Sequence, residues 1–402
     1  MSANWKTKPL GSVATLQRGF DLPARLRKPG TVPIVTSSGI EDRHYESKVK
    51  GPGVITGRYG TIGKVFFVRD HFWPLNTTLY VCDFHKNDPL FISYLLRTID
   101  FHTHSGKSGV PGVNRNDLHE IVVALPPTKA EQEAIAEALS DADALIESLD
   151  QLLAKKRHLK QAAMQELLTG KKRLPGFEGK PGYKQTELGL IPEDWEMETI
   201  GNLFNISGGL SASRDQLGAD GHCYLHYGDI HTSSKSFVDV PSEIADIPKL
   251  PIPLGKVSSV SLLKDGDVVF VDASEDEAGT SKHVVINNPE NIPFISGLHT
   301  IVAKSKSNTL DHLYRRYCFQ TSAIKKQIRF FAVGTKVLGI SKSNIVKIMI
   351  PLPSVPEQTA IATILSDMDT EIAALEAKLA KARQLKQGMM QELLTGRIRL
   401  IN

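Results

Sequence analysis

The sequence predicts an α+β protein: two globular domains, related by an approximate two-fold axis and separated by two long antiparallel helices that form a coiled coil. The first observation behind this prediction is a sequence repeat, with copies at residues 131–174 and 357–400. The copies are identical at 27 of 44 positions at a constant offset of 226 residues, whereas ordinary residue usage gives roughly two or three chance identities. The second observation is that each copy follows a region of short β-rich runs.

The regions in front of the two copies share a fainter skeleton. Trp5 and Leu10-Gly11 correspond to Trp195 and Ile200-Gly201, and the stretch 112–126 resembles 339–353. A solenoid repeats units of about 20–50 residues and needs at least three of them. Two copies of a much larger unit instead predict one molecule with internal two-fold symmetry.

Composition sets the broad class. The chain has 402 residues, of which 41% are hydrophobic and 23% charged, as in a globular protein with more than one domain. No apolar run reaches the length of a membrane span and the N-terminus lacks a signal-peptide core, so we expect a cytoplasmic protein without a membrane partner. Three separated cysteines predict neither disulfides nor zinc. A net charge of +4 permits nucleic-acid binding without arguing for it.

The globular regions consist of short candidate strands between Gly, Asn and Asp residues. A short helix is expected in each region, at 89–98 and at 311–328. The clearest candidate strands are 53–56, 64–68, 78–81, 267–271, 283–286 and 300–303.

Each duplicated segment begins and ends like a single helix. Thr128-x-x-Glu131 and Ser354-x-x-Glu357 fit the capping box, in which a hydroxyl and a glutamate satisfy the first N–H groups reciprocally. Gly170 and Gly396 suit left-handed C-terminal caps. We therefore expect helices of about 40 residues, roughly 60 Å long.

Apolar residues in alternating steps of four and three predict that these helices pair along a coiled-coil seam. Antiparallel pairing fits the chain path best. A further apolar stripe, Leu159, Met164, Leu385 and Met390, indicates either a second contact surface or packing against the domains. The seam positions are Ile135, Leu139, Ile146, Leu149 and Leu153 in the first helix, and Ile361, Leu365, Ile372, Leu375 and Leu379 in the second.

The resulting division places the first domain at residues 1–126 and the first helix at 127–174. A linker follows at 175–190, and its start belongs to a Pro/Gly-rich stretch. The second domain covers 191–353, and the second helix with its tail covers 354–402.

A search for catalytic motifs finds none that is complete. Gly106-Lys107-Ser108 lacks the upstream glycine of a phosphate-binding loop. Asp88-Pro89-Leu90-Phe91 lacks the second proline of an adenine-methyltransferase motif. Glu46-Ser47-Lys48 and the pair His102 and His104 are isolated, so we expect no catalytic residue and no metal site.

Polar, glycine-rich loops are the better functional candidates. The loop 57–64 sets Arg58, Tyr59 and Lys64 among glycines, where they can approach a nucleic-acid groove; an ordinary charged hairpin is the alternative. In the first domain the candidate DNA contacts are Ser37, Ser38, Arg43, His44, Tyr45, Arg58, Tyr59, Lys64, Asn76, Thr77, Lys107, Asn114 and Arg115. In the second they are Tyr227, Asp229, His231, Ser274, Lys282, His299, Lys336, Ser341 and Lys342.

These motifs together resemble the specificity (S) subunits of type I restriction-modification systems. The most specific are the two E-Q-x2-I-A-x2-L-S-x2-D segments, at 131–143 and 357–369, and the two Q-E-L-L-T-G segments, at 165–170 and 391–396. The loop 57–64 and Tyr227-Gly-Asp-Ile230 also resemble sequence motifs of the family's target-recognition domains. The resemblance covers nearly the whole chain.

The resemblance implies a non-catalytic subunit whose two domains each read one half of a split, asymmetric site on double-stranded DNA. It implies that the helix pair sets the spacer and docks two modification (methyltransferase) subunits, and optionally two restriction subunits. S-adenosylmethionine would belong to the methyltransferase, ATP and Mg²⁺ to the restriction subunit, and no cofactor to this chain. The alternatives are a coiled-coil scaffold without a DNA role and a divergent, self-contained DNA methyltransferase.

Overall fold

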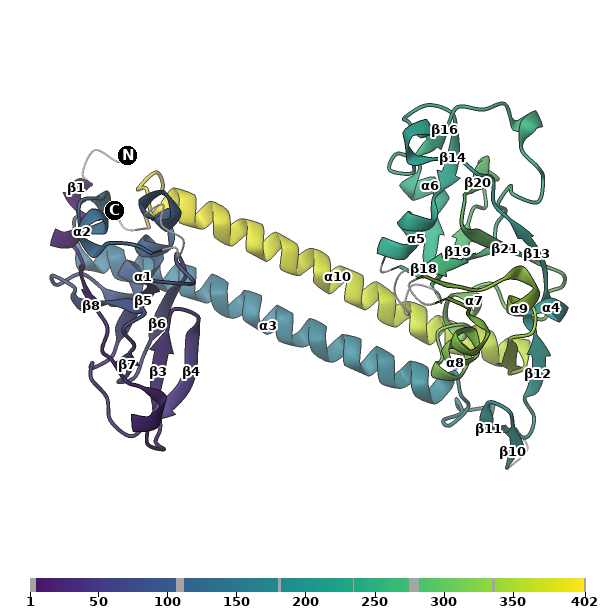
Figure 1. Cartoon of the computed structure of the whole chain (residues 1–402), viewed down its shortest axis with the longest axis horizontal. Coiled ribbons are helices and arrows are strands. Elements are labelled where there is room, and N and C mark those ends of the chain that lie inside the picture. The colour runs from purple at the N-terminus through teal and green to yellow at the C-terminus, as the bar shows by residue number, and fades with distance from the viewer. Residues whose placement is uncertain are drawn as a thin grey trace. The chain divides into compact units, whose positions relative to one another are not determined.

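The computed structural model describes residues 5–105, 112–179, 182–233, 235–274, 282–334 and 337–400. The chain divides into two compact units (Figure 1). Unit 1 contains Met1–Leu153 and Leu375–Asn402, and unit 2 contains Ala154–Ala374. Each unit therefore holds one globular domain together with part of each duplicated helix. Within the described residues, no helix combines the length and the apolar character that crossing a membrane requires.

Unit 1 is built on a four-stranded sheet of order β2-β8-β5-β6, and helix α1 contacts β5 and β6. A second sheet has the order β4-β3-β7, and β1 pairs with β9. The bounds are β1 Lys6–Pro9, β2 Thr15–Arg18, β3 Val32–Thr36, β4 Gly39–His44, β5 Gly53–Gly57, β6 Val65–Val68, β7 Trp73–Pro74, β8 Thr78–Asp83, α1 Pro89–Arg97, α2 Arg115–His119 and β9 Val122–Leu125.

Unit 2 contains a five-stranded sheet of order β13-β21-β17-β19-β15 and a three-stranded sheet of order β16-β14-β20. Three strand pairs, β10-β11, β12-β23 and β18-β22, complete it. The strands are β10 Tyr183–Thr186, β11 Gly189–Pro192, β12 Glu196–Thr199, β13 Phe204–Gly208, β14 His222–Leu225, β15 Phe237–Asp239, β16 Lys249–Leu250, β17 Val268–Val271, β18 Ala273–Ser274, β19 His283–Asn287, β20 Phe294–Ser296, β21 Thr300–Ser305, β22 Leu338–Gly339 and β23 Met349–Leu352. The helices are α4 Ile200–Leu203, α5 Tyr227–Thr232, α6 Val240–Glu243, α7 Arg315–Cys318, α8 Ser322–Phe331 and α9 Lys342–Ile345.

The two units share one topology. The order β2-β8-β5-β6 in unit 1 corresponds strand for strand to β13-β21-β17-β19 in unit 2, and each second sheet contains a parallel pair, β3-β7 and β14-β20. Every strand expected from the sequence is present. The α+β class with two related domains is therefore confirmed.

The single helix expected at 311–328 is wrong. Two helices, α7 and α8, occupy this region, separated by residues 319–321. The Thr321 hydroxyl accepts a hydrogen bond from the Ile324 backbone N–H at 3.3 Å. This N-cap begins a new helix instead of continuing the old one.

The long helices are α3, Lys129–Leu167, and α10, Val355–Leu393, each of 39 residues. In unit 1, Asp143 forms an ion pair with Lys386, and Asp150 forms one with Arg383 at 2.8 Å. In unit 2, Lys160 pairs with Asp369, and Lys156 with Glu371 at 2.8 Å. Residue numbers rise along one helix as they fall along the other, so within each unit the two segments run antiparallel.

Apolar side chains of both helices enter the domain cores. Ile135 and Leu139 of α3 lie in the core of unit 1, and Ile361 and Leu365 of α10 in that of unit 2. Further along, Leu149, Leu153 and Leu379 are buried, whereas Ile146, Ile372 and Leu375 are half-buried. Of the second stripe, Met164 and Met390 pack against the domain cores, while Leu159 and Leu385 are exposed. For the methionines, packing against the domains is thus the correct alternative.

The start of each long helix is fixed by a buried carboxylate. Glu131 accepts two hydrogen bonds from Arg399, both 2.8 Å, and one from the Trp5 indole at 3.4 Å. Only 1% of the Glu131 side chain is exposed. The capping box is therefore only half right: the Glu131 N–H does bond the Thr128 hydroxyl at 3.2 Å, but its carboxylate binds Arg399 instead of returning to the helix start.

Unit 2 repeats this arrangement, which we call the Trp–Glu–Arg joint. Glu357 accepts hydrogen bonds from Arg173 at 2.6 and 2.8 Å and from the Trp195 indole at 3.2 Å. Burial disfavours the Arg173 charge, but hydrogen bonds to Asp194 and Glu357 outweigh it and raise the pKa of Arg173. Gly170 follows α3 at φ +70°, where a Cβ atom would lie 2.4 Å from the Pro192 ring and 3.2 Å from Trp195.

Neighbouring polar contacts are duplicated as well. The Gln132 amide oxygen accepts the Asp88 N–H at 2.9 Å in unit 1, and Gln358 accepts the Asp311 N–H at 2.8 Å in unit 2. The Tyr94 hydroxyl donates to Asp143 at 2.7 Å, and Tyr317 donates to Asp369 at 2.9 Å. Burial and the bonded carboxylate raise the pKa of both tyrosines. The repeated sequence thus encodes repeated attachment of domain to helix.

Candidate nucleic-acid interface

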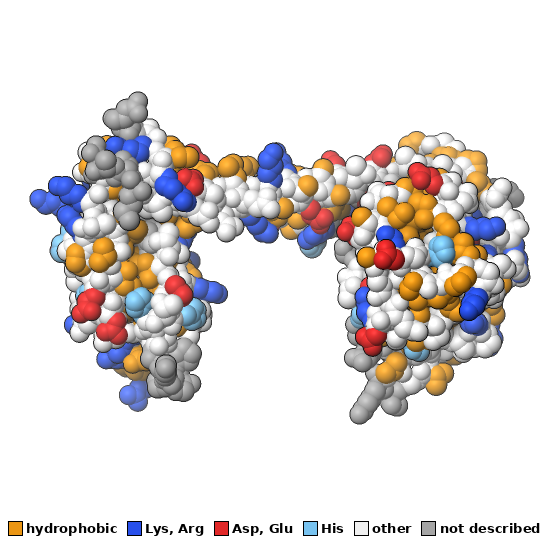
Figure 2. Space-filling model, turned by 90° about the horizontal axis from the view of Figure 1, so that it is seen from above, with side chains coloured by type: hydrophobic (Ala, Val, Ile, Leu, Met, Phe, Trp, Pro, Cys, Tyr) orange, Lys and Arg blue, Asp and Glu red, His pale blue; other side chains and the backbone are white. Residues whose placement is uncertain are grey.

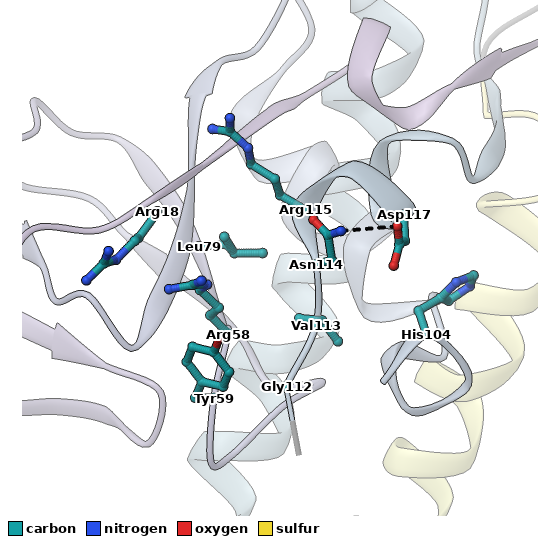
Figure 3. Close-up of a pocket in the computed structure, with 10 residues that line it drawn as sticks. All are labelled: Arg18, Arg58, Tyr59, Leu79, His104, Gly112, Val113, Asn114, Arg115 and Asp117. Carbon is teal, nitrogen blue, oxygen red and sulfur yellow. Dashed lines mark hydrogen bonds between the residues drawn. The ribbon is translucent and has the colours of Figure 1, made fainter. Parts of the chain in front are cut away.

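On the face that Figure 2 shows, basic and acidic side chains of the described residues are interspersed on both units. Positive charge is concentrated at one smaller site in unit 1. A hollow of about 620 Å³ in unit 1 is lined by three arginines, Arg18, Arg58 and Arg115, together with Tyr59, Leu79, His104, Gly112, Val113, Asn114 and Asp117. In Figure 3, Arg58 extends above Tyr59 toward Arg18, and Arg115 rises from the start of α2, whereas His104 points away from them.

The loop after β5 positions Arg58 and Tyr59. Their backbone N–H groups donate to the Thr77 carbonyl oxygen at 2.8 and 3.2 Å, and the Arg58 carbonyl accepts the Val113 N–H at 3.0 Å. Gly57 is required here, since a Cβ atom would lie 1.8 Å from the Thr61 carbonyl oxygen. The Arg58 guanidinium lies 4.5 Å from the centroid of the Tyr59 ring, so its planar fork is already oriented.

The three guanidinium groups are available to an anion. Among the described residues, Arg58 and Arg115 form no ion pair, and Arg18 reaches only Asp21, at 3.4 Å, where both side chains are exposed. Asn114 caps α2 by accepting the Asn116 N–H at 3.1 Å, which holds Arg115 at the rim. Such a hollow can bind phosphate oxygens or the acceptor edge of a guanine.

The other residues predicted for the first domain divide into three groups. Ser37 and Ser38 form the β3–β4 turn, and the Ser37 hydroxyl lies beside Gly60 near the hollow. Lys64 is exposed at the end of the loop. Arg43 and Tyr45 lie along β4 and just beyond it, outside the hollow lining, where Arg43 donates to the Thr31 carbonyl at 2.7 Å.

The structure changes the interpretation of three further predicted residues, His44, Asn76 and Thr77, and does not describe two others. His44 is buried, accepts the Lys28 N–H at 3.0 Å and packs edge-on against Trp73, so it cannot reach a ligand from this position. Thr77 holds the Arg58 loop through its backbone, and Asn76 binds Asp21. Lys107 in unit 1 and Lys336 in unit 2 lie outside the described residues.

In unit 2 the predicted residues meet at the end of β14 and at β18. The His299 ring stands edge-on to Tyr227 with centroids 5.4 Å apart, and its Nδ1 lies 3.2 Å from Asp272. His299 has φ +57°, an uncommon conformation for a residue other than glycine. His231 lies 3.4 Å from the Ser274 hydroxyl, and the Lys282 ammonium donates to the His231 carbonyl.

The charges around this cluster are mostly paired. A hollow of about 420 Å³ includes Arg214, which binds Asp229 at 2.6 Å, and Lys235, which binds Glu243 at 2.8 Å. Burial, followed by the nearby Arg214 charge, lowers the pKa of His226 beside them. Ser341 and Lys342 lie at the start of α9, where the Ser341 hydroxyl accepts the Asn344 N–H at 3.2 Å.

Sequence reasoning missed Arg18 in unit 1, and Arg214 and His226 in unit 2, and it considered His104 only as a possible metal ligand. Arg18 had a usable signal, since it is the last residue of a strand and directly precedes Gly19, which corresponds to Gly209 in the second domain. Arg214 lies in an irregular segment and is brought to the cluster only by tertiary packing. No group of three metal-ligating side chains is found among the residues that the structure describes.

Comparisons with known proteins show which family this chain resembles. The family model described as the type I restriction modification DNA specificity domain matches twice, at residues 2–155 and 192–384. The MjaVIII type I restriction enzyme specificity subunit of Methanocaldococcus jannaschii is 28% identical over 320 residues, which is 78% of this chain and 70% of that one. The putative MjaX specificity subunit of the same organism is 28% identical over 331 residues, 79% of this chain and 69% of its own length.

Two solved structures share the fold. The S subunit of a type I restriction-modification system from M. genitalium superposes with a TM-score of 0.63 at 16% identity, covering 98% of this chain and 96% of that one. A chain from a study of complex assembly and conformational transition in the type I system gives a TM-score of 0.52 at 17% identity, covering 99% of each.

Proposed function

The chain belongs to the type I restriction-modification DNA specificity family, and on that premise we propose that its two units read the two halves of one split, asymmetric DNA target. It is a specificity subunit, the part of such a system that selects the sequence, and not a catalytic subunit. The two recognition domains have one scaffold but different contact side chains. Two such domains suit a target whose halves differ.

The observation that carries this proposal is the arginine hollow of unit 1. Arg58 is stacked on Tyr59, lacks an acidic partner among the described residues and is held by two backbone hydrogen bonds to Thr77. Arginine presented in this way matches the O6 and N7 acceptors of guanine in the major groove. Arg18 and Arg115 line the same hollow, where their charges suit phosphate contacts, which fix the register without reading sequence.

The long helices have a separate role in this proposal. They form one antiparallel coiled coil that separates the recognition domains, 1–126 and 191–353, and sets the unspecified spacer between half-sites. The antiparallel ion pairs in each unit and the buried Leu149, Leu153 and Leu379 support this arrangement. The duplicated helix surfaces suit two identical partners, which we assign as two methyltransferase subunits.

Chemistry in the complex belongs to those partners. Each methyltransferase subunit supplies S-adenosylmethionine and takes the target adenine out of the duplex, since a base inside the stack cannot be modified. Restriction subunits, where present, supply ATP- and Mg²⁺-dependent cleavage. This chain contributes the choice of site and the distance between its halves.

The test is to express the chain with its methyltransferase subunit and map methylated adenines across the host genome. A bipartite motif is expected, with a G·C pair in the half read by unit 1. Arg58→Ala should relax that position alone and weaken binding there by about 1–3 kcal/mol, the value of one bidentate base contact.

Arg69→Ala is the matched control, because Arg69 is exposed in the same unit but lies outside the hollow. Its methylated motif should equal that of the unchanged chain. Equal loss at both half-sites in Arg58→Ala would make Arg58 structural. If no motif depends on this chain at all, the scaffold alternative replaces the proposal.

A further inference from the structure

Residues 312–356 of unit 2 contain no aspartate or glutamate, yet they hold eight lysines and arginines. The matching stretch of unit 1, residues 89–130, contains Asp100, Asp117 and Glu120. Arg315 is buried, where it binds the Gly266 and Leu310 carbonyls, and Arg316 lies 3.9 Å from the Phe237 ring. These two arginines are structural. The remaining positive charge therefore belongs to α8, to α9 and to the residues between and just beyond them.

Helix α8 presents its charge on one face. Ile324 and Ile328 are fully or almost fully buried and form its inner side, while Lys325, Lys326 and Arg329 are exposed on the outer side. Lys325 and Lys326 make no ion pair among the residues that the structure describes. Within the described part of the chain, no acidic side chain neutralises their charges.

An aromatic side chain lies within this positive face. Phe330 is 82% exposed and Val333, just beyond the helix, is 76% exposed. A phenylalanine so exposed loses most of the stabilisation that burial would give it. Exposed apolar groups surrounded by cations are typical of surfaces that contact sugars and base edges as well as phosphates.

The helix is held rigidly in place. The Gln327 amide bonds both the N–H and the carbonyl of Met349, each at 2.9 Å, and the Thr321 hydroxyl caps the first turn. Asn344 of α9 donates to the Phe331 carbonyl at 3.2 Å. The charged face therefore does not depend on a flexible loop for its position.

The same face is continuous with the candidate surface of unit 2. Val333 and Gly339 exchange two backbone hydrogen bonds of 2.9 and 3.0 Å. Strand β22, which contains Gly339, pairs with β18, so Leu338 lies opposite Ser274, the residue that contacts His231. Figure 1 places α8 and β18 in the same unit, with α7 near both.

We propose that the outer face of α8 is a DNA-backbone site, with Lys325 and Lys326 neutralising phosphates and Phe330 packing against the adjoining deoxyribose. The ligand is double-stranded DNA next to the half-site that unit 2 reads, so the inference rests on the proposed function. It assigns to α8 the sequence-independent attraction that the paired charges of the unit 2 hollow do not supply. In unit 1, unpaired arginines within the hollow provide that attraction.

The test measures DNA affinity of the complete methyltransferase complex as a function of salt, with a duplex carrying its mapped motif and a scrambled duplex. Each phosphate contact contributes about 0.9 to the slope of log K against log salt. Lys325→Ala/Lys326→Ala should therefore reduce the slope by about 1.8 on both duplexes and leave the methylated motif unchanged. Phe330→Ala should weaken both duplexes with an unchanged slope, because no charge is lost.

Lys256→Ala/Lys264→Ala is the control, since these lysines are equally exposed in unit 2 but lie outside the acid-free stretch. Alanine favours helix at least as well as lysine, so α8 stays folded in the test variant. If Lys325→Ala/Lys326→Ala leaves the salt slope unchanged, the inference is wrong, whereas the methylated motif still supports the proposed function. Loss of the methyltransferase subunit from the complex, with DNA affinity of the chain unchanged, would make the face a protein-docking surface instead. Absence of a motif in the unchanged complex would reject the proposed function itself.

Discussion

The candidate surfaces of the two units carry opposite charge balances. The unit 1 hollow sets Arg18, Arg58 and Arg115 against Asp117 alone, whereas the unit 2 hollow sets Arg214 and Lys235 against Asp229, Glu243 and Asp246. Both cations of unit 2 are consumed in ion pairs. Because the sheet order and the helix attachments are the same in both units, the scaffold does not determine the chemistry of recognition.

Burial explains why one part is repeated and the other is not. The tryptophan and glutamate of each Trp–Glu–Arg joint are buried, as are Gln132 and Gln358, so a change in one partner leaves a buried polar group without its hydrogen bond. Side chains at the hollows are solvated and can change without such a penalty. The most informative tests therefore compare a joint residue of one unit with its counterpart in the other unit. The same comparison is made for the hollow residues.

The largest effect is expected at the joint of unit 2. Arg173→Ala leaves the Glu357 carboxylate, which is 1% exposed, with the Trp195 indole as its one remaining side-chain donor among the residues that the structure describes. Breaking a buried pair from one side typically costs about 3–5 kcal/mol, and we expect the lower end because 12% of Arg173 is exposed. Hydrogen exchange of each unit in denaturant would show the loss in unit 2.

The counterpart Arg399→Ala should destabilise unit 1 by less, since Arg399 is more exposed and, among the described residues, pairs with no second carboxylate like Asp194. Adding Glu357→Gln to Arg173→Ala should recover part of the stability by removing the buried charge. Equal losses in the two units would show that Asp194 contributes nothing to the joint.

A smaller effect, of opposite sign in the two units, is expected at the hollows. Asp229→Asn releases Arg214 and should tighten DNA binding about two- to fivefold, in line with a partly exposed ion pair worth up to about 1 kcal/mol. Arg115→Ala in unit 1 should weaken binding and reduce the salt slope by about 0.9. Titrations of the complex at several salt concentrations measure both. Weaker binding in Asp229→Asn would mean that Asp229 accepts a hydrogen bond from DNA.

The smallest effect concerns pH and unit 1 alone. The Leu16 N–H donates to His119 Nε2 at 2.8 Å, and Val346 lies at the corresponding place in unit 2. Burial, followed by the Arg115 charge, lowers the pKa of His119, so its contribution is complete above the unfolded value of about 6.5 and is lost as pH falls below it.

Losing this hydrogen bond should lower the stability of unit 1 by about 1 kcal/mol between pH 7 and pH 5. His119→Gln retains an acceptor that does not titrate there, so it should flatten the pH dependence of unit 1 measured by hydrogen exchange. An unchanged profile would assign the dependence to other histidines.

Sequence reasoning succeeded where local patterns decide the structure. The long helices, their glycine caps and the six expected strands follow from periodicity and breakers, and Arg58 was chosen as a candidate because glycines flank its loop on both sides. It failed where side chains choose partners far along the chain. Glu131 satisfies a capping pattern, yet its carboxylate binds Arg399, 268 residues away. His44 looked like a loop donor, but packing against Trp73 places it inside.

The duplicated joint bears on how new specificities arise. Each domain is attached through the same tryptophan, glutamate and arginine, and its recognition side chains lie outside that attachment. A single genetic exchange that carries a whole domain between two such joints would transfer its half-site preference with the buried contacts intact. Diversification of the target thus needs one recombination event in place of many compensated point mutations.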